Sequence, residues 1–177
     1  TVVYKNVIDT LKKEAESTNM AALKGVCNTI DMRLKEIDHL ALSIGSNRII
    51  RQSSFIGDGY NNWQCVRELS KYKSSNQFVY DIILYLPNRN DRVYSTFKAG
   101  NLDTLFNYMY KYENWTKEEL LQIMKEEPAP IMRAVESINK ARTVTDNCAT
   151  YIYPLSINTI KPQGLVIFLI KDQSLSD

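Results

Sequence analysis

The chain has 177 residues, of which 44% are hydrophobic and 24% charged, and this composition is typical of a soluble globular domain. Its 22 basic and 20 acidic residues are interspersed and give a net charge of +2, which indicates neither a nucleic-acid-binding surface nor an acidic tail. Three cysteines, Cys27, Cys65 and Cys148, form no CxxC pair, which argues against a zinc site or a disulfide framework and predicts three buried thiols.

The N-terminal quarter of the chain predicts one long helix. Residues 2–44 contain no proline and one glycine, Gly25, and their apolar residues recur at steps of three and four. Gly45 is expected to end the helix in a left-handed conformation. We expect the apolar stripe of residues 23–44 to pack on the rest of the chain. The sparser stripe of residues 7–15 indicates either a solvated stalk or a coiled-coil seam, and we hypothesise that it pairs with a second subunit in a homodimer.

The next segments predict a helix followed by a β-hairpin. Residues 61–75 show helical spacing of apolar side chains. Residues 78–86 are rich in β-branched and aromatic side chains, which favour a strand. The polar residues 88–91 predict a turn, and residues 92–97 predict the second strand of the hairpin.

The second half of the chain predicts two short helices and further strands. Residues 102–112 and 116–125 have helical patterns, and the latter begins with a Thr-x-x-Glu capping box. Residues 131–138 are ambiguous, whereas residues 148–157 predict a strand. Residues 164–171 are almost wholly apolar and predict a central strand that is buried on both faces.

This order of elements indicates an α+β fold in two parts. A domain in which helices are segregated to one side of an antiparallel sheet belongs to the α+β class. We therefore expect one long helix over residues 1–46 and a compact α+β domain over residues 47–177. The chain starts at Thr1 rather than methionine and ends in DQSLSD without a closing element, so we expect a piece of a longer protein. No apolar run approaches the roughly 20 residues that span a bilayer.

No catalytic motif is present. The sequence lacks GxSxG, HExxH, GxxxxGK[ST] and GxGxxG, and its single histidine, His39, falls inside the predicted long helix beside no marked nucleophile. His39 is better explained as a helix-surface residue than as a general base. We therefore expect a non-enzymatic protein without metal or cofactor.

Eleven tyrosines, several in or beside the predicted strands, favour a pocket for a small polar molecule. Aromatic rings with a hydroxyl group can both pack against and hydrogen-bond a ligand. A converging arginine and aspartate could bind a carboxylate or an amine. The alternatives are ordinary packing for the aromatic residues and solvated loops for the charged ones. The candidate ligand-binding residues are Tyr85, Tyr94, Trp115, Arg133, Asp146, Tyr151 and Tyr153.

Four segments in this order resemble a known family. They read STNMAALKGVCNTIDMRLKEIDHLALSIGSNRII, FVYDIILYLPNRNDRVYS, NWTKEELLQIM and ATYIYPLSINTIKPQGLVIFLIKDQSL. The chain resembles the extracytoplasmic Cache sensor region of membrane-bound AraC-type transcriptional regulators of Firmicutes. That family has an IDxRLxEID-like stretch, matched at residues 30–38, a hairpin matched at residues 80–95 and a closing strand pair matched at residues 153–172. The resemblance covers almost the whole chain.

The resemblance implies a signalling or dimerisation helix over residues 1–46 and a PAS-like Cache sensor module over residues 47–177. The module is expected to have an antiparallel sheet of about five strands that is flanked by short helices. The resemblance also implies a small-molecule ligand, such as a sugar or an organic acid, and membrane and DNA-binding segments outside this chain. The arginine-x-tryptophan-tyrosine signature of amino-acid-binding relatives is replaced by YENWTKEE, so amino-acid sensing is not supported. We expect an extracytoplasmic ligand sensor, with a histidine-kinase or chemoreceptor sensor, or a scaffold or adhesion module, as alternatives.

Overall fold

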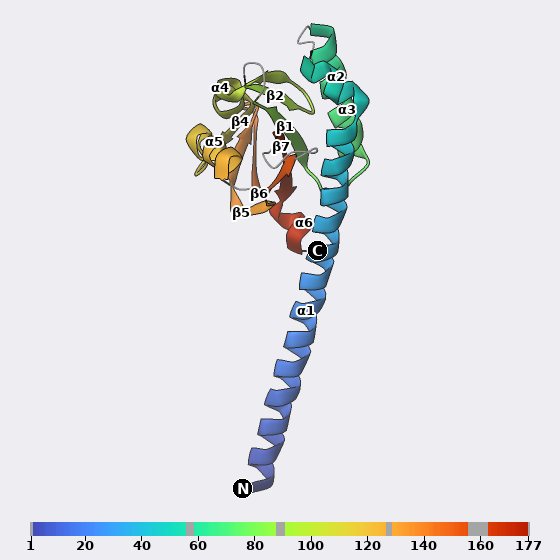
Figure 1. The fold of residues 1–177 in the computed structure, drawn as a ribbon. Helices are drawn as coiled ribbons and strands as arrows, with labels where there is room; N and C mark the ends of the chain where they lie inside the picture. The colour runs from blue at the N-terminus through green and yellow to red at the C-terminus, as the bar shows by residue number, and fades with distance from the viewer. Residues whose placement is uncertain (1, 56–58, 88–90, 127–128, 156–162, 177) are drawn as a thin grey trace. The chain divides into compact units, whose positions relative to one another are not determined.

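The structure, a computed structural model, describes residues 2–55, 59–87, 91–126, 129–155 and 163–176. Helices come first and are followed by one antiparallel sheet with short helices between its strands (Figure 1). The α+β class predicted from the sequence is confirmed. The chain divides into two compact units, Thr1–Ile37 and Asp38–Asp177, and the second contains the whole sheet.

The first helix, α1, spans Val2–Ser46, close to the predicted bounds. Two residues of the predicted apolar stripe, Ala41 and Ile44, are fully buried, whereas Leu23 and Val26 are 62% and 51% exposed. The burial of Ala41 and Ile44 agrees with the prediction for residues 38–44, whereas residues 23–37 belong to the other compact unit, and their packing on the rest of the chain stays a prediction. The side chains of residues 7–15 lie outside those described, so the dimer seam stays a prediction.

The end of α1 is correctly located by Gly45, but by a different mechanism. Gly45 lies inside the last helical turn, and none of the described glycines has a positive φ angle. Its missing side chain permits close packing instead, because a Cβ at Gly45 would lie 2.8 Å from Leu155 Cδ2. Asn47 then caps a helix that the sequence analysis missed, α2 (Arg48–Phe55), by accepting a hydrogen bond from the Ile49 amide at 2.9 Å.

Seven strands form a single sheet, where the sequence predicts about five. The helix predicted over residues 61–75 is confirmed as α3. The predicted hairpin is confirmed by the pairing of β1 with β2. Residues 88–90 of its predicted turn lie outside the described residues. The two unpredicted strands, β3 and β4, have three residues each, too few for an alternating pattern to be recognised. The elements after α2 are α3 (Gly59–Ser74), β1 (Asp81–Leu86), β2 (Arg92–Ser95), β3 (Ala99–Asn101), α4 (Leu102–Thr104), the π-helix η1 (Leu105–Met109), β4 (Tyr110–Tyr112), α5 (Lys117–Glu126), β5 (Ile131–Lys140), β6 (Val144–Leu155), β7 (Gly164–Lys171) and α6 (Asp172–Ser176).

The strand order is β3-β2-β1-β7-β6-β5-β4, and every neighbouring pair is antiparallel. The apolar strand β7 therefore occupies the centre, as predicted, and all of its residues before Lys171 are buried. It begins at Gly164, where an added Cβ would lie 2.7 Å from the Tyr85 backbone oxygen. Only glycine permits this close approach of β7 to β1 without a shift of the backbone.

The helix predicted over residues 102–112 is replaced by three shorter elements. Asn101 caps the single turn α4 by accepting a hydrogen bond from the Thr104 amide at 2.9 Å, and η1 follows it. The chain then becomes β4, in which Tyr110 and Tyr112 are buried and Lys111 is exposed. Pairing with β5, which is distant in sequence, overrides the local helical pattern.

Two other predictions concern the following segments. The capping box at the start of α5 is confirmed, because the Thr116 amide donates to Glu119 Oε2 at 2.9 Å and the Glu119 amide donates to Thr116 Oγ1 at 3.3 Å. The ambiguous residues 131–138 belong to strand β5, whose register with β6 shifts between Arg133 and Glu136. Such a bulge redirects the side chains on either side of it.

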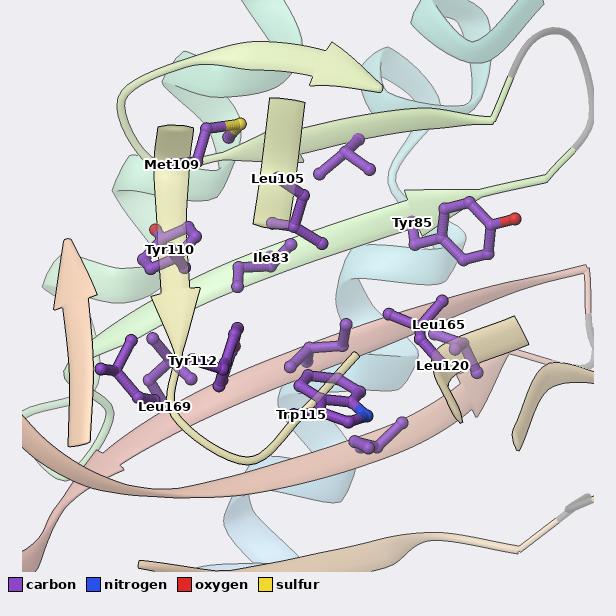
Figure 2. Close-up of a cluster of buried hydrophobic side chains, with 14 of the residues drawn as sticks. Ile83, Tyr85, Leu105, Met109, Tyr110, Tyr112, Trp115, Leu120, Leu165 and Leu169 are labelled. Carbon is purple, nitrogen blue, oxygen red and sulfur yellow. The ribbon is translucent and has the colours of Figure 1, made fainter. Parts of the chain in front are cut away.

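The two faces of the sheet differ in what covers them. We call the face covered by α4, η1 and α5 the inner face and the face covered by α3 the outer face (Figure 1). The inner face carries a continuous apolar cluster to which strands and short helices both contribute (Figure 2). Its buried members are Ile83, Tyr85, Val93, Leu102, Leu105, Met109, Tyr110, Tyr112, Trp115, Leu120, Ile138, Cys148, Ile152, Leu165, Ile167 and Leu169.

The cysteines are only partly as predicted. Cys65 and Cys148 are buried, but Cys27 is exposed on α1, so the prediction of three buried thiols is wrong for Cys27. Burial raises the pKa of the Cys65 thiol to about 12 and that of Cys148 to about 11. Both buried thiols are therefore protonated at neutral pH and act as small apolar side chains.

Candidate functional site

A cluster of polar and aromatic side chains interrupts the apolar inner face. It comprises Tyr112 on β4, Trp115 between β4 and α5, Arg133 and Glu136 on β5, and Thr150 on β6, and we call it the Trp115 cluster. Three separate strands and one loop position these side chains. The bulge of β5 lies between its arginine and its glutamate.

Aromatic and charged contacts fix the geometry of the Trp115 cluster. The Tyr112 ring meets the Trp115 ring edge-on, with 4.9 Å between centroids and 88° between planes, and Figure 2 shows both rings on the inner face. The Arg133 guanidinium carbon lies 5.0 Å from the Trp115 ring centroid, a cation–π arrangement. Arg133 Nη2 also lies 3.5 Å from Glu136 Oε1 and donates to the Asn114 carbonyl at 3.1 Å. These contacts hold the guanidinium against the indole ring.

Two buried polar atoms of the Trp115 cluster, Trp115 Nε1 and Arg133 Nε, have no hydrogen-bond partner among the described residues, and two more, Tyr112 Oη and Thr150 Oγ1, have none there beyond each other. The side chains of Tyr112, Trp115 and Thr150 are only 7%, 3% and 0% exposed. An unsatisfied buried donor or acceptor costs about 1–3 kcal/mol. Such atoms are rare in folded proteins, and bound water or a ligand is the usual partner of a group of them on one face.

The protonation states define what the Trp115 cluster can recognise. Burial, and then the nearby Glu136 carboxylate, raise the pKa of Tyr112 well above its usual range, so its hydroxyl stays a donor at neutral pH. The indole and guanidinium N–H groups are also donors, and the Thr150 hydroxyl can donate or accept. The arrangement therefore suits a small molecule with several acceptor oxygens.

The other tyrosines predicted as site residues lie elsewhere. Tyr85 belongs to the inner apolar cluster, and its hydroxyl donates to Asp91 Oδ1 at 2.8 Å at the end of the hairpin. Tyr94 is buried and its hydroxyl donates to Asn62 on α3, on the outer face. Tyr151 donates to Asp38 Oδ1 at 2.7 Å. The half-buried Tyr153 is two residues further along the same strand, and so on the same face as Tyr151.

The structure thus brings Trp115 and Arg133 together and leaves the remaining predicted residues apart. Asp146 does not converge with Arg133, because it pairs with Lys171 while Arg133 pairs with Glu136. Sequence reasoning missed Tyr112 and Thr150 as site residues. Neither stands out locally, and only the fold places Tyr112 against the Trp115 ring and Thr150 in register with Arg133.

The ion pair of Asp146 predicts a pH-dependent contribution to stability. Lys171 Nζ lies 2.8 Å from Asp146 Oδ1, and this hydrogen bond, followed by one from Tyr80, lowers the pKa of Asp146 below its ordinary value of 3.8. A carboxyl with a lowered folded-state pKa stabilises the fold fully above its unfolded pKa and loses this effect as pH falls through the folded pKa. Asp146→Asn should therefore reduce the free energy of unfolding at neutral pH, and the reduction should shrink in acid. Urea unfolding at about pH 7 and about pH 2.5 measures this, and an equal difference at both pH values would contradict it.

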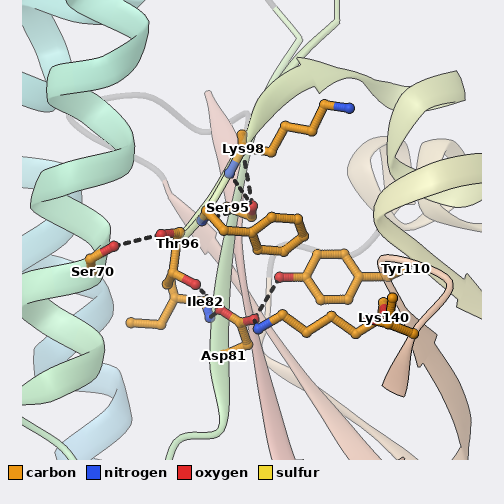
Figure 3. A network of polar contacts seen from close by, with 10 residues as sticks. Ser70, Asp81, Ile82, Ser95, Thr96, Lys98, Tyr110 and Lys140 are labelled. Carbon is orange, nitrogen blue, oxygen red and sulfur yellow. Dashed lines mark hydrogen bonds and ion pairs between the residues drawn. The ribbon is translucent and has the colours of Figure 1, made fainter. Parts of the chain in front are cut away.

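A second polar network, centred on Asp81, was not expected from the sequence. Asp81 is 0% exposed and accepts hydrogen bonds from Tyr110 Oη at 2.7 Å and Thr96 Oγ1 at 2.5 Å, and it forms an ion pair with Lys140 (Figure 3). The Lys140 ammonium also lies 5.0 Å from the centroid of the Phe97 ring. Every strong partner of this carboxylate is therefore supplied by the protein, which makes the network a structural element rather than a ligand site.

Searches for metal and membrane features give the following results for the described residues. They contain no group of three or more His, Cys, Asp and Glu side chains that could hold a metal ion. Among the helices in the described part of the chain, none combines the length and apolarity needed to cross a bilayer. His39 is exposed on α1.

Three solved structures share this fold. The extracellular domain of the histidine kinase vpHK1S-Z8 matches with a TM-score of 0.53 at 10% identity, over 86% of this chain and 54% of that chain. A domain of a sensory box/GGDEF family protein from Vibrio parahaemolyticus matches with a TM-score of 0.51 at 8% identity, over 84% and 55%. The periplasmic sensory domain of the Campylobacter jejuni chemoreceptor Tlp1 matches with a TM-score of 0.51 at 10% identity, over 86% and 59%.

These similarities identify the fold as that of PAS-like (Cache) sensory domains, as the sequence resemblance implies. The chain spans just over half the length of the three structures. No protein-family model matches the sequence, and no curated protein is significantly similar to it.

Proposed function

We propose that this chain is the extracytoplasmic ligand-sensing domain of a membrane-bound bacterial signalling protein and that the Trp115 cluster binds its ligand. The observation that carries the proposal is the group of four polar atoms, buried on the inner face, that have no hydrogen-bond partner outside the Trp115 cluster among the described residues. The sensory fold supports the same role, because the three similar structures are sensor domains of signalling proteins. The chain itself is proposed to be non-enzymatic.

The charge balance of the Trp115 cluster favours a hydroxyl-rich ligand such as a sugar. Glu136 lies beside Arg133 and is only 6% exposed, so the positive charge of the guanidinium is already matched. An organic acid would bring an additional negative charge close to a buried carboxylate, which is unfavourable in a low-dielectric environment. Neutral hydroxyl groups can use the free donors and the Thr150 hydroxyl without this cost.

A ligand acts on such a domain by shifting its conformational equilibrium. The last turns of α1, residues 38–46, belong to the same compact unit as the sheet, and Tyr72 of α3 donates to the Ser43 carbonyl at 3.2 Å. A ligand-dependent rearrangement of this unit therefore involves the end of α1. We propose a homodimer through this helix, flanking membrane segments and an AraC-type DNA-binding output, for which the sequence resemblance is the support. A histidine-kinase or chemoreceptor output is the second candidate, favoured by the proteins that share the fold.

A thermal-shift screen of the purified chain with sugars and organic acids tests the proposal. A ligand at a hundredfold its dissociation constant should stabilise the folded state by about 2.7 kcal/mol. Stabilisation by sugars rather than by acids is the expected result. The absence of stabilisation by any small molecule, combined with binding to a protein or a matrix, would support a scaffold or adhesion role instead.

Removing the Thr150 hydroxyl should separate stability from binding. Thr150→Val preserves the shape of the side chain and eliminates a buried hydroxyl whose one recorded polar contact is Tyr112, so we expect the free energy of unfolding to stay equal or rise by about 1 kcal/mol. Ligand affinity should fall at the same time. Chemical unfolding and titration with the ligand measure the two effects. Thr145→Val, at an exposed position of the same strand, is the matched control, and a loss of stability in Thr150→Val would contradict the assignment.

A further inference from the structure

The Trp115 ring is enclosed in the structure. Trp115 is only 3% exposed, and its buried Nε1 atom donates to no residue in the described part of the chain. Tyr112 and Thr150 are buried as well. A ligand can form hydrogen bonds only with atoms that it can reach. For a ligand that binds at the Trp115 cluster, as proposed above, the structure therefore shows a closed state, and part of the cluster has to move before binding.

The side chain of Arg133 both covers the Trp115 ring and reaches solvent. Its guanidinium carbon lies over the ring, 5.0 Å from the centroid, and the side chain is 23% exposed. A guanidinium that leaves the ring for solvent regains its hydration. Phe106, a partly buried aromatic neighbour whose centroid lies 5.5 Å from that of Trp115, would expose apolar surface if it moved instead. Displacement of Arg133 is therefore favoured over displacement of Phe106.

Three polar contacts hold Arg133 over the ring. Its Nη2 atom donates to the Asn114 carbonyl at 3.1 Å and lies 3.5 Å from Glu136 Oε1. The Asn114 backbone amide donates to the other carboxylate oxygen, Glu136 Oε2, at 2.7 Å. Asn114, Arg133 and Glu136 thus form a closed set of contacts, which we call the clasp. The clasp joins the residue before Trp115 to both sides of the β5 bulge.

The contacts of the clasp differ in strength. The hydrogen bond from Asn114 to the buried Glu136 carboxylate is short and charge-assisted. The ion pair of Glu136 with Arg133 is longer, and pairs with a partly exposed member are weak because water screens them. Glu136 is therefore the fixed member of the clasp and Arg133 the movable one. We infer that Arg133 is the gate of the Trp115 cluster: the ligand reaches Trp115 after the guanidinium leaves the indole ring, and the charge of Glu136 sets how often it leaves.

This inference rests on the proposed function and adds the regulation of the same site. Departure of the guanidinium would uncover a flat indole face, which can pack against the apolar face of a sugar ring, and would free its N–H groups to donate to hydroxyls. The apparent affinity of a ligand is reduced by the fraction of molecules that are in the open state. A variant that opens more often and keeps Arg133 should therefore bind its ligand faster.

Acrylamide quenching of Trp115 fluorescence tests the gate without any ligand. The chain has two tryptophans, and Trp63→Phe removes the exposed one, so Trp115 remains as the single emitter. In this background, Glu136→Gln keeps an acceptor oxygen for the Asn114 amide and removes the charge that attracts Arg133. We expect the quenching constant to rise about threefold in Glu136→Gln, as the loss of one weak ion pair predicts, and further in Arg133→Ala. Arg133→Lys, which keeps the charge but not the planar group over the ring, should give an intermediate rise.

The control is Arg142→Ala. Arg142 lies over the Tyr108 ring at 4.6 Å in the same kind of contact, but it donates to the Asn107 carbonyl rather than to that of Asn114. Its quenching constant should equal that of the Trp63→Phe parent. No rise in a folded Glu136→Gln would overturn the inference, even beside a rise in Arg133→Ala, because Arg133 would then be a fixed cover. A parent quenching constant that increases steeply in urea below the unfolding transition would also overturn it, because Trp115 would then be exposed by unfolding.

A sugar identified by the thermal-shift screen supplies a second readout. Its association rate should be higher with Glu136→Gln than with the parent, and a lower rate would contradict the gate. The two proposals can fail separately. If no small molecule stabilises the chain, the proposed function fails, whereas acrylamide quenching decides the gate in either case.

Discussion

Replacing Asp81 with leucine is expected to lower the free energy of unfolding by about 3–5 kcal/mol, because the substitution breaks a buried ion pair and leaves one charge without its partner. The Asp81 carboxylate is fully buried and is the shared acceptor of Tyr110, Thr96 and Lys140. These partners come from β4, from the segment after β2 and from the end of β5. Loss of the carboxylate therefore affects three separated parts of the sheet at once.

A double-mutant cycle distinguishes the ion pair from simple side-chain packing. Lys140→Met alone should also destabilise the protein, because it leaves the carboxylate buried and unpaired, whereas the double variant should lose less than the sum of the two single variants. Urea unfolding measures each value. Asp103→Asn, which removes an exposed pair with Lys117, serves as the control and should have little effect. A loss in Asp81→Leu no larger than in Asp103→Asn would show that the network does not stabilise the fold.

The second large effect is expected at the centre of the sheet. Ile167 on β7 is 0% exposed and lies between Ile83 on β1 and Ile152 on β6, with which it is in direct register. Truncation to alanine leaves a cavity that its neighbours, held by strands on both sides, cannot close. Ile167→Ala should therefore reduce the free energy of unfolding by about 2–5 kcal/mol, and Ile167→Val by about 0.5–1.5 kcal/mol.

The graded series of Ile167 variants is checked by chemical denaturation at constant pH. The dependence of the free energy on denaturant concentration should stay unchanged, because the unfolded surface area is nearly the same. Val144→Ala, at a position on β6 that is 48% exposed, is the matched truncation and should cost much less. Similar losses at the two positions would mean that β7 is not the packed centre of the domain.

The elements that could be predicted from the sequence are those whose signal is local. The apolar run of β7, the period of α3 and the capping box of α5 each lie within one short segment, and each prediction is confirmed. The three-residue strands β3 and β4 could not be recognised, because their pairing with β2 and β5 gives them their structure. The same limit explains why one helix was predicted where α4, η1 and β4 occur.

The candidate site was only partly predictable for a related reason. Trp115 and Arg133 were selected from their residue types, and they do lie together. Tyr112 and Thr150 have no local signal that distinguishes them from other strand residues. The register of the strands places Thr150 opposite Arg133, and Tyr112 packs against the Trp115 ring. Asp81 was missed because an aspartate at the start of an apolar strand has no local signature of burial.

The sheet's outermost strands have one more consequence. The two edge strands of the sheet, β3 and β4, are only three residues long. They therefore offer few backbone N–H and C=O groups with which another polypeptide could pair. Long, flat edge strands act as templates for intermolecular strand addition and fibril growth, whereas short edge strands do not. The apolar β7, which would be an aggregation hazard if it were accessible, is shielded by three strands on either side. The domain is thereby suited to remain dispersed at high local concentrations.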